Sequence, residues 1–365
     1  MDVIREGVGS TIPPRNVLVA IDSTDHSRAA AVWASHYLAH RQEDCLHLVT
    51  VLTSPAPAGR GAPVATVGAV AAMAQTMHQA HEEERAEAAR LLEAARNHLV
   101  LKHGARCEVK EHCLNSSGGA SGVAHSIVLF AERHELDAVV LGSRGLGPFR
   151  SALASLVGQG SVSAYCLHRL SCAVAIVRGD PTALEANPVE PAIMVAVDGS
   201  PESQVALDWV GATPFPVDAT FHLVTARPGD GDLVTQPESP SARVLELREK
   251  AERTALLDAA ATRVPEDAVV EVTLELEDEA VGPVLTHYAT EHMVTAAVLG
   301  ARDLGSIKRA MLSLLGSGSV SEYVMQHLPL PVIVVRRKES AHDKHALSRG
   351  RGSVKDLPRG CWEHC

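Results

Sequence analysis

The feature that most constrains the fold of this chain is an internal repeat. The segment VLVAIDSTDHSRAAAVWA, which starts at Val17, recurs as IMVAVDGSPESQVALDWV, which starts at Ile193. Farther along, AVVLGSRGLG and GQGSVSAYCLHRLSCAVAIVR recur in the same order as AAVLGARDLG and GSGSVSEYVMQHLPLPVIVVR. The repeated unit is of domain size, and 365 residues are long for one domain and comfortable for two. We therefore expect two similar domains, each with its own core.

The spacing between the copies is not constant. Asp22 and Asp198 are 176 positions apart, but Gly142 and Gly300 are only 158 apart, so the first copy contains 18 additional residues. The stretch SPAPAGRGAPVATVGA, which follows Leu52, is rich in Pro, Gly and Ala and is the expected place for them. We expect a mobile loop there, which could close over a ligand as a lid. The alternative is a solvent-exposed loop whose sequence has drifted and that has no function.

The arrangement of apolar runs predicts the fold class. In each copy, short Val, Leu and Ile runs alternate with longer segments of helical periodicity, which indicates βαβ units and a parallel sheet. The class expected is α/β, with two tandem Rossmann-like domains, each a five-stranded parallel sheet with helices on both faces. The expected strands lie near 16–21, 46–51, 106–112, 138–142 and 173–177 in the first copy, and near 193–197, 220–226, 269–275, 296–300 and 332–335 in the second.

Composition changes between the repeats indicate the domain boundaries. GDPTALEANPVEPA reads as a Pro-rich connector, and the end of the chain is polar and basic. The expected organisation is an N-terminal extension (1–14), a first domain (15–178), a linker (179–191), a second domain (192–337) and a disordered tail (338–365).

Charge and composition exclude several classes of protein. The formal net charge is −11, and Lys and Arg are scattered, which argues against nucleic acid as a partner. No apolar run reaches the roughly 20 residues of a membrane span, and the first residues do not resemble a signal peptide. Seven cysteines fit reduced thiols better than a disulfide framework. We expect a cytoplasmic protein that does not associate with membranes.

Candidate ligand-binding residues follow the strands of the first copy. In a doubly wound sheet, ligands bind beyond the carboxyl ends of the strands. Asp22 follows the first strand, and Gly142–Gly145 ends the fourth. Gly160–Ser163 opens the last helix, whose N-terminal N–H groups and hydroxyls suit an anion. Together these segments predict a mononucleotide site, although a single GxxG or a Gly-Ser before a helix is more often structural.

Other possible sites carry weaker signals. His78 and His81 lie on a Glu-rich helix and are expected at its surface, and the terminal CWEHC offers three ligands at most, where a structural zinc site takes four. We therefore predict no metal site. The sequence has no HExxH and no Walker A motif, and no general base can be assigned, so at most slow hydrolysis of a bound nucleotide is expected.

The combination of these motifs resembles the universal stress protein family, and specifically its tandem members. The resemblance depends on V-A-x-D with a serine five residues on (Ser27, Ser203), on LGSRGLG, and on GSVS before the closing strand. It implies an adenine nucleotide alpha hydrolase-like fold, a role in stress response, and ATP, with Mg, as the ligand. The residues implied in the first domain are Ala20, Asp22, Val51, Gly142, Gly145, Gly160, Ser161 and Ser163, and more weakly in the second Asp198, Gly300, Gly318 and Ser319.

This chain departs from the family's ATP-binding pattern at two places. The pattern has nine residues between G-x-x-G and G-[S/T], whereas fourteen separate Gly145 from Gly160. The five extra residues could add a helical turn beside the site or fill it. In the second copy Asp303 replaces the second glycine, and a carboxylate there would repel phosphates. The acidic residues Glu271, Glu275, Glu277, Asp278 and Glu279 add to that repulsion.

Three functions remain open at this point. The first is a stress protein regulated by ATP in its first domain, with the second domain structural. The second is a module that binds no nucleotide and acts by dimerisation and through an unknown protein partner. The third, an enzyme such as an adenylating ligase, lacks any supporting signature. The resemblance also implies that the two domains pair through their last strands as a pseudo-dimer, with a further homodimer possible.

Overall fold

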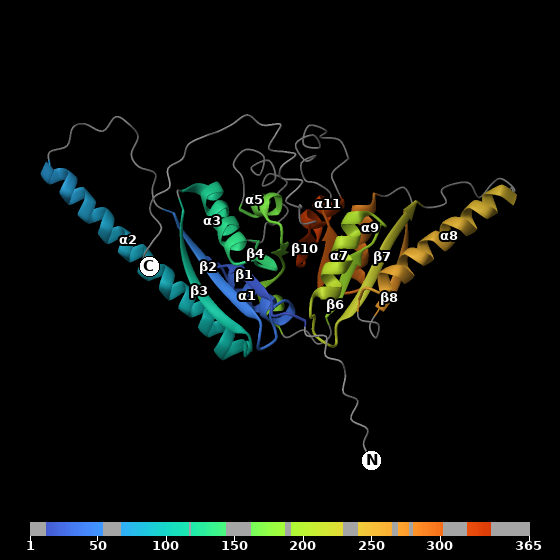
Figure 1. The fold of residues 1–365 in the computed structure, drawn as a ribbon, viewed down its shortest axis with the longest axis horizontal. Coiled ribbons are helices and arrows are strands. Elements are labelled where there is room, and N and C mark those ends of the chain that lie inside the picture. Colours follow the sequence, from blue (N-terminus) through green and yellow to red (C-terminus); the bar gives the residue numbers. More distant parts are fainter. Residues whose placement is uncertain are drawn as a thin grey trace, which may run out of the picture.

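The chain forms a single twisted sheet that is covered on both faces by helices (Figure 1). It is described here from a computed structural model. The sheet has ten strands in the order β3-β2-β1-β4-β5-β10-β9-β6-β7-β8. The residues that the structure describes are 12–53, 67–116, 118–143, 162–186, 191–228, 240–264, 269–276, 280–301 and 320–336.

The first half of the sheet contains the first repeat. Its strands are parallel, and the order 3-2-1-4-5 is that of a doubly wound sheet. The elements are β1 (Asn16–Ala20), α1 (Asp25–Tyr37), β2 (Cys45–Thr53), α2 (Val67–Asn97), the π-helical turn η1 (His98–Lys102), β3 (Glu108–Ser116), α3 (Gly119–Arg133), β4 (Ala138–Gly142), α5 (Val162–Arg169) and β5 (Ala173–Val177).

The second half repeats this order after a short linker helix. That helix, α6 (Pro181–Glu185), lies inside the segment expected to be a plain connector. The elements that follow are β6 (Ala192–Ala196), α7 (Pro201–Ala212), β7 (Thr220–Pro228), α8 (Pro240–Ala261), β8 (Val269–Leu276), α9 (Val281–Glu291), β9 (Ala296–Gly300), α11 (Val320–His327) and β10 (Val332–Val335). All five strands are again mutually parallel. The expected α/β class is confirmed.

The two halves meet at their closing strands. β5 and β10 pair in antiparallel orientation, with Val332 opposite Ile176 and Val334 opposite Val174. This is the antiparallel pair within an otherwise parallel sheet, so the two expected sheets form one continuous sheet. The pairing covers the edges of two strands whose residues are almost entirely buried.

The core lies on both faces of the sheet, because alternate residues of each strand point to opposite sides. In β1, Val17 and Val19 belong to the apolar layer that includes residues of α1, α2, α7 and α8, whereas Leu18 belongs to the layer that includes residues of α3, α5, α9 and α11. Both apolar layers extend through the two halves. Trp33, on α1, is one of the largest fully buried side chains, with 2% of its surface exposed.

The additional residues of the first copy are not mainly in the Pro-rich loop, so the expected place was wrong. α2 has 31 residues and α8 has 22, and the last residues of that Pro-rich stretch, from Val67, are already helical. The connections before the two helices, residues 54–66 and 229–239, are of similar length. Half of the insertion therefore lengthens a helix. Of the expected mobile loop, residues 54–66 lie outside the described part, as does the expected tail 338–365.

Two further expectations concern membranes and thiols. No described helix is long and apolar enough to cross a membrane. The cysteines of the described residues are free thiols, and all except Cys113 are buried. Burial raises the pKa of Cys107 and of Cys166 to about 12, so both are protonated at neutral pH.

Candidate functional site

The candidate site of the first domain lies where the winding of the sheet reverses. β1 pairs with β2 on one side and with β4 on the other, and the chain crosses over to opposite faces from this point. Ala20 lies opposite Leu141, so Asp22 and Gly142 follow at the same carboxyl edge. Such a crevice is the ordinary binding position in open α/β sheets.

A network of hydrogen bonds fixes the turn at Asp22. The Asp22 N–H donates to Ser27 Oγ at 3.2 Å, and that hydroxyl lies 2.9 Å from the Asp22 carbonyl oxygen, to which it donates. Thr24 caps α1 by accepting from the Ser27 N–H, and the Thr24 N–H donates to the Asp22 carboxylate at 3.0 Å. Ser27 is buried and Asp22 is half-buried. The carboxylate is thus held in place beside the start of a helix, where its charge is favourable.

Apolar side chains lie next to this carboxylate. Ala20 and Val51 are half-buried and pack against the apolar layer beneath α3 and α5, as does Leu114 of β3. Val51 and Leu114 are opposite each other in the β2–β3 register. These residues would offer a flat apolar surface to a planar base.

Gly142 has a structural reason to be glycine. A β-carbon added there would lie 2.9 Å from the His26 carbonyl oxygen and 3.0 Å from the Ser27 α-carbon. The missing side chain lets β4 approach the first turn of α1. Close packing alone accounts for this residue, whether or not a phosphate binds nearby.

The remaining predicted residues are only partly described. Gly145, Gly160, Ser161, Gly318 and Ser319 lie outside the described residues. Ser163 is half-buried in the first turn of α5. In the second copy, Ser321 at the corresponding position of α11 donates from Oγ to the Gly300 carbonyl oxygen at 3.0 Å. There the start of the last helix lies beside the end of β9, which is the proximity that the phosphate-site prediction requires.

The site of the second copy differs in exposure and in charge. Asp198 is exposed, and it accepts from the Ser200 N–H at 2.9 Å. Gly300 packs even more closely than Gly142, against the backbone of Glu202. Of the expected acidic group, Glu271 lies opposite Leu223 well inside β8, so it is not at the carboxyl edge. Glu275 is near that edge, whereas Glu277, Asp278 and Glu279, like Asp303, lie outside the described residues.

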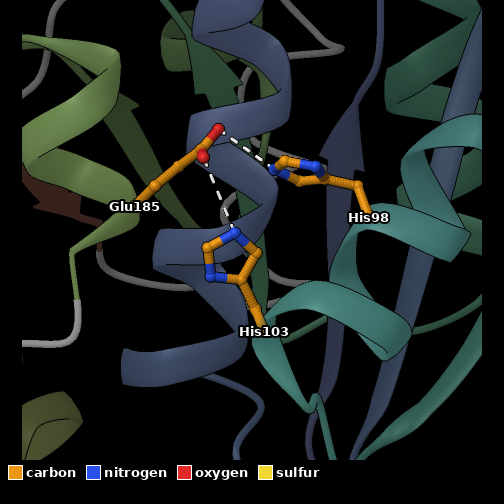
Figure 2. Close-up of side chains that lie close together, drawn as sticks. All are labelled: His98, His103 and Glu185. Atoms are coloured by element: carbon orange, nitrogen blue, oxygen red, sulfur yellow. Dashed lines mark ion pairs between the residues drawn. The ribbon is translucent and has the colours of Figure 1, made fainter.

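A cluster that sequence reasoning missed joins the first domain to the linker (Figure 2). His98 Nε2 lies 3.1 Å from Glu185 Oε1, and His103 Nε2 lies 3.6 Å from Glu185 Oε2. Lys102 Nζ donates to the second oxygen at 2.9 Å. Burial would raise the pKa of Glu185, but the ion pairs with Lys102 and His98 outweigh burial and lower it. No local spacing indicates this cluster, since Glu185 is far from the histidines in sequence.

A second histidine cluster lies within the first domain. His47 Nδ1 is 3.0 Å from His112 Nε2, and His134 packs beside both rings. Burial, followed by the charges of His112 and His134, lowers the pKa of His47 to about 4. In the second domain, His222 shares a hydrogen bond with the Tyr288 hydroxyl at 2.7 Å, and burial lowers its pKa as well.

A cavity of about 270 Å³ lies between the two halves. Trp33 and Arg178 line it from the first domain, and Thr295 and Pro331 from the second. Burial lowers the pKa of Arg178. The Nε atoms of both Trp33 and Arg178 have no hydrogen-bond partner among the described residues.

The fold and the site together define a tandem doubly wound α/β protein with its candidate site at the strand carboxyl ends. The model of the universal stress protein family matches residues 14–178 and 191–336. The chain therefore belongs to the universal stress protein family, as a tandem member, and the expected resemblance is confirmed.

Solved structures of this family resemble the chain. A universal stress protein from Archaeoglobus fulgidus is 19% identical with a TM-score of 0.52, over 90% of this chain and 98% of that one. One from Lactobacillus plantarum is 24% identical with a TM-score of 0.32, over 46% of this chain and 99% of that one. One from Arabidopsis thaliana with AMP bound is 19% identical with a TM-score of 0.27, over 46% and 99%. No curated protein matched the chain.

Proposed function

We propose that this chain is a stress-response protein whose first domain binds ATP, or a related adenine nucleotide, together with Mg. The nucleotide would act as a regulatory ligand. The observation that carries the proposal is the half-buried Asp22 carboxylate, fixed by Thr24 and Ser27 at the point where the sheet winding reverses. Membership of the universal stress protein family supports it. AMP is bound in the Arabidopsis thaliana relative.

Each part of the site has a defined role in the proposal. The Asp22 carboxylate would accept hydrogen bonds from ribose hydroxyls or from the adenine edge. Ala20 and Val51 would contact the base. The phosphates would lie against the backbone of Gly142 and Gly145 and against the start of α5, at Gly160, Ser161 and Ser163, where N–H groups and the helix dipole favour an anion. No residue is assigned as a general base, so the nucleotide acts as a ligand.

The second domain would be structural in this proposal. Asp198 is exposed, whereas Asp22 is half-buried, so it offers a less ordered acceptor. Asp303 occupies the position of Gly145 in the repeat and would repel a phosphate. Gly300 would then serve the packing of that half, since a β-carbon there would meet the backbone of Glu202.

Equilibrium binding of labelled ATP to the full chain with Mg²⁺ tests both points. We expect about one site per chain. Gly145→Asp, which copies the second domain, should weaken binding by at least tens of fold, on the order of 2 kcal/mol. Asp303→Gly is the matched control and should leave the affinity of the first site unchanged. Two equal sites, or unchanged affinity in Gly145→Asp, would refute the assignment.

A second candidate function is an interaction module that binds no nucleotide. The close packing of Gly142 against His26 and Ser27 favours it, because this explains the glycine without a phosphate. Absence of ATP binding with Mg²⁺ to a folded full chain would select this function. The partner protein would then recognise the paired domains.

A further inference from the structure

We propose that His98, His103 and Glu185 form a binding site for a divalent transition-metal ion of the zinc class. His98 begins η1, at the end of the long helix α2, and His103 directly follows η1. The carboxylate comes from the last residue of the linker helix α6. The three residues together supply two nitrogens and one carboxylate, a donor set typical of zinc sites that keep one position for water.

The geometry is close to that of a metal site. The candidate ligand atoms of the three residues all lie within 4.8 Å of one another. Ligand atoms around a tetrahedral zinc, at about 2.0–2.1 Å from the metal, lie roughly 3.3 Å apart. The two nitrogen–oxygen distances are near that value, 3.1 Å from His98 to Oε1 and 3.6 Å from His103 to Oε2. The three groups would have to draw together from separations of up to 4.8 Å to bind an ion.

The histidine nitrogens that would bind the metal lack other partners. Nε2 of His98 and Nε2 of His103 are buried, and the Glu185 carboxylate is the one polar group that the described residues place beside them. Both face the Glu185 carboxylate (Figure 2). Buried polar atoms are ordinarily satisfied, but here two imidazole nitrogens share one carboxylate, which already pairs with Lys102. A metal ion satisfies all three groups at once.

Lys102 competes for the carboxylate but does not close the site. Its ammonium lies 2.9 Å from Glu185 Oε2, while 61% of the side chain is exposed. An exposed ion pair of this kind contributes little and can exchange with solvent. A doubly charged ion between two imidazoles would therefore displace Lys102 from the carboxylate. Protonated histidines paired with Glu185 are the alternative that the experiment must exclude.

A metal at this position would have a structural consequence. α6 belongs to the link between the two domains and also lines the interdomain cavity, through Ala183 and Leu184. Bound metal would fasten this linker to the end of α2. Because the ion would bind the folded chain through residues distant in sequence, it should stabilise that state.

The site can be tested on the full chain without any nucleotide. Cys361→Ser/Cys365→Ser serves as the background, because the terminal thiols could bind zinc themselves. Titration with Zn²⁺ followed by calorimetry should show one site in this background. Co²⁺ should give the intense visible absorption of a tetrahedral site. Glu185→Gln and His103→Gln should each weaken Zn²⁺ binding at least tenfold and abolish that absorption.

The control is His78→Gln/His81→Gln, which removes two histidines of α2 that are exposed or half-exposed. It should leave both signals unchanged. Far-UV circular dichroism should show that Glu185→Gln, a near-isosteric change, still folds. Unaltered Zn²⁺ affinity in Glu185→Gln and His103→Gln, or no binding to the background chain, would overturn the proposal. A melting temperature that rises with acidification but not with Zn²⁺ would also overturn it, in favour of protonated ion pairs.

Discussion

The α-carbon of Ser27 would lie only 3.0 Å from a β-carbon placed on Gly142. Ser27 begins the buried face of α1, and Gly142 ends β4, so this approach sets how closely the helix packs on the strand. The same residue, Ser27, holds the Asp22 turn. Helix packing and the candidate site thus depend on one short piece of backbone.

We expect Gly142→Ala to destabilise the chain, because the added methyl group would meet the backbone of His26 and Ser27. Overpacking of this kind costs about 1–3 kcal/mol. Gly300→Ala should cost more, since its β-carbon would be closer still to the backbone of Glu202. Urea-induced unfolding measures both free energies. Equal stability of Gly142→Ala and the parent chain would show that the strand and helix can separate at no cost.

Loss of the Ser27 hydroxyl should weaken both stability and ligand binding. Ser27→Ala removes the acceptor for the Asp22 N–H in a buried position, which costs about 1–3 kcal/mol. If the first domain binds ATP, its affinity should fall as well, because the carboxylate loses its fixed position. Ser23→Ala, an exposed change in the same turn, is the control and should be neutral in both measurements. An unchanged unfolding free energy in Ser27→Ala would contradict this role.

Stability should fall between pH 6.5 and pH 4 because of His47. Its pKa is about 4 in the folded chain and 6.5 ordinarily, so the unfolded chain binds a proton that the folded chain does not. The loss should begin as the pH falls through 6.5 and reach about 3 kcal/mol near pH 4. The groups that face His47 are His112, His134, Lys110 and Glu108. In His47→Leu, the free energy of unfolding should fall by about 3 kcal/mol less between pH 6.5 and pH 4 than in the parent chain. His78→Leu should show the same pH dependence as the parent chain.

Cutting the linker should not separate the two halves. A protease site placed at 187–190 would break the chain between the domains, but β5 and β10 would remain paired through Ala175 and Ile333. We expect the cut halves to elute together in gel filtration. Val334→Lys, which places a charge at a position that is 1% exposed in this pairing, should release them after cutting. Separation of the cut but otherwise unaltered chain would refute the pairing in solution.

The strands could be predicted from the sequence because burial on both faces makes them continuous apolar runs. β4 and β5 start and end where the runs of Val, Leu and Ala do. The place of the insertion could not be predicted this way. The offset between the copies is known only at its two ends. The Pro-rich composition after Leu52 favoured an insertion in the loop, although the helix α2 is the element that is longer.

Residues of the candidate site were predictable only where they follow strands. Asp22 and Gly142 meet at the switch point because strand ends of a parallel sheet share an edge. The spacing could not show that Gly142 packs against α1, since glycine serves close packing and phosphate binding equally well. His98 and Glu185 meet through the docking of α6, a tertiary contact that leaves no periodic signal.

Because β5 and β10 belong to one chain, dilution does not separate the two halves that pair through them. Two separate chains that pair through an edge come apart as their concentration falls, whereas covalently linked halves meet at an effective concentration set by the linker alone. The two halves also have separate coding sequences within one gene, so each can change on its own. A symmetric dimer must carry any substitution at both of its sites, but here Gly145 and Asp303 occupy corresponding positions in one molecule. Joining the halves permits them to diverge while they remain partners.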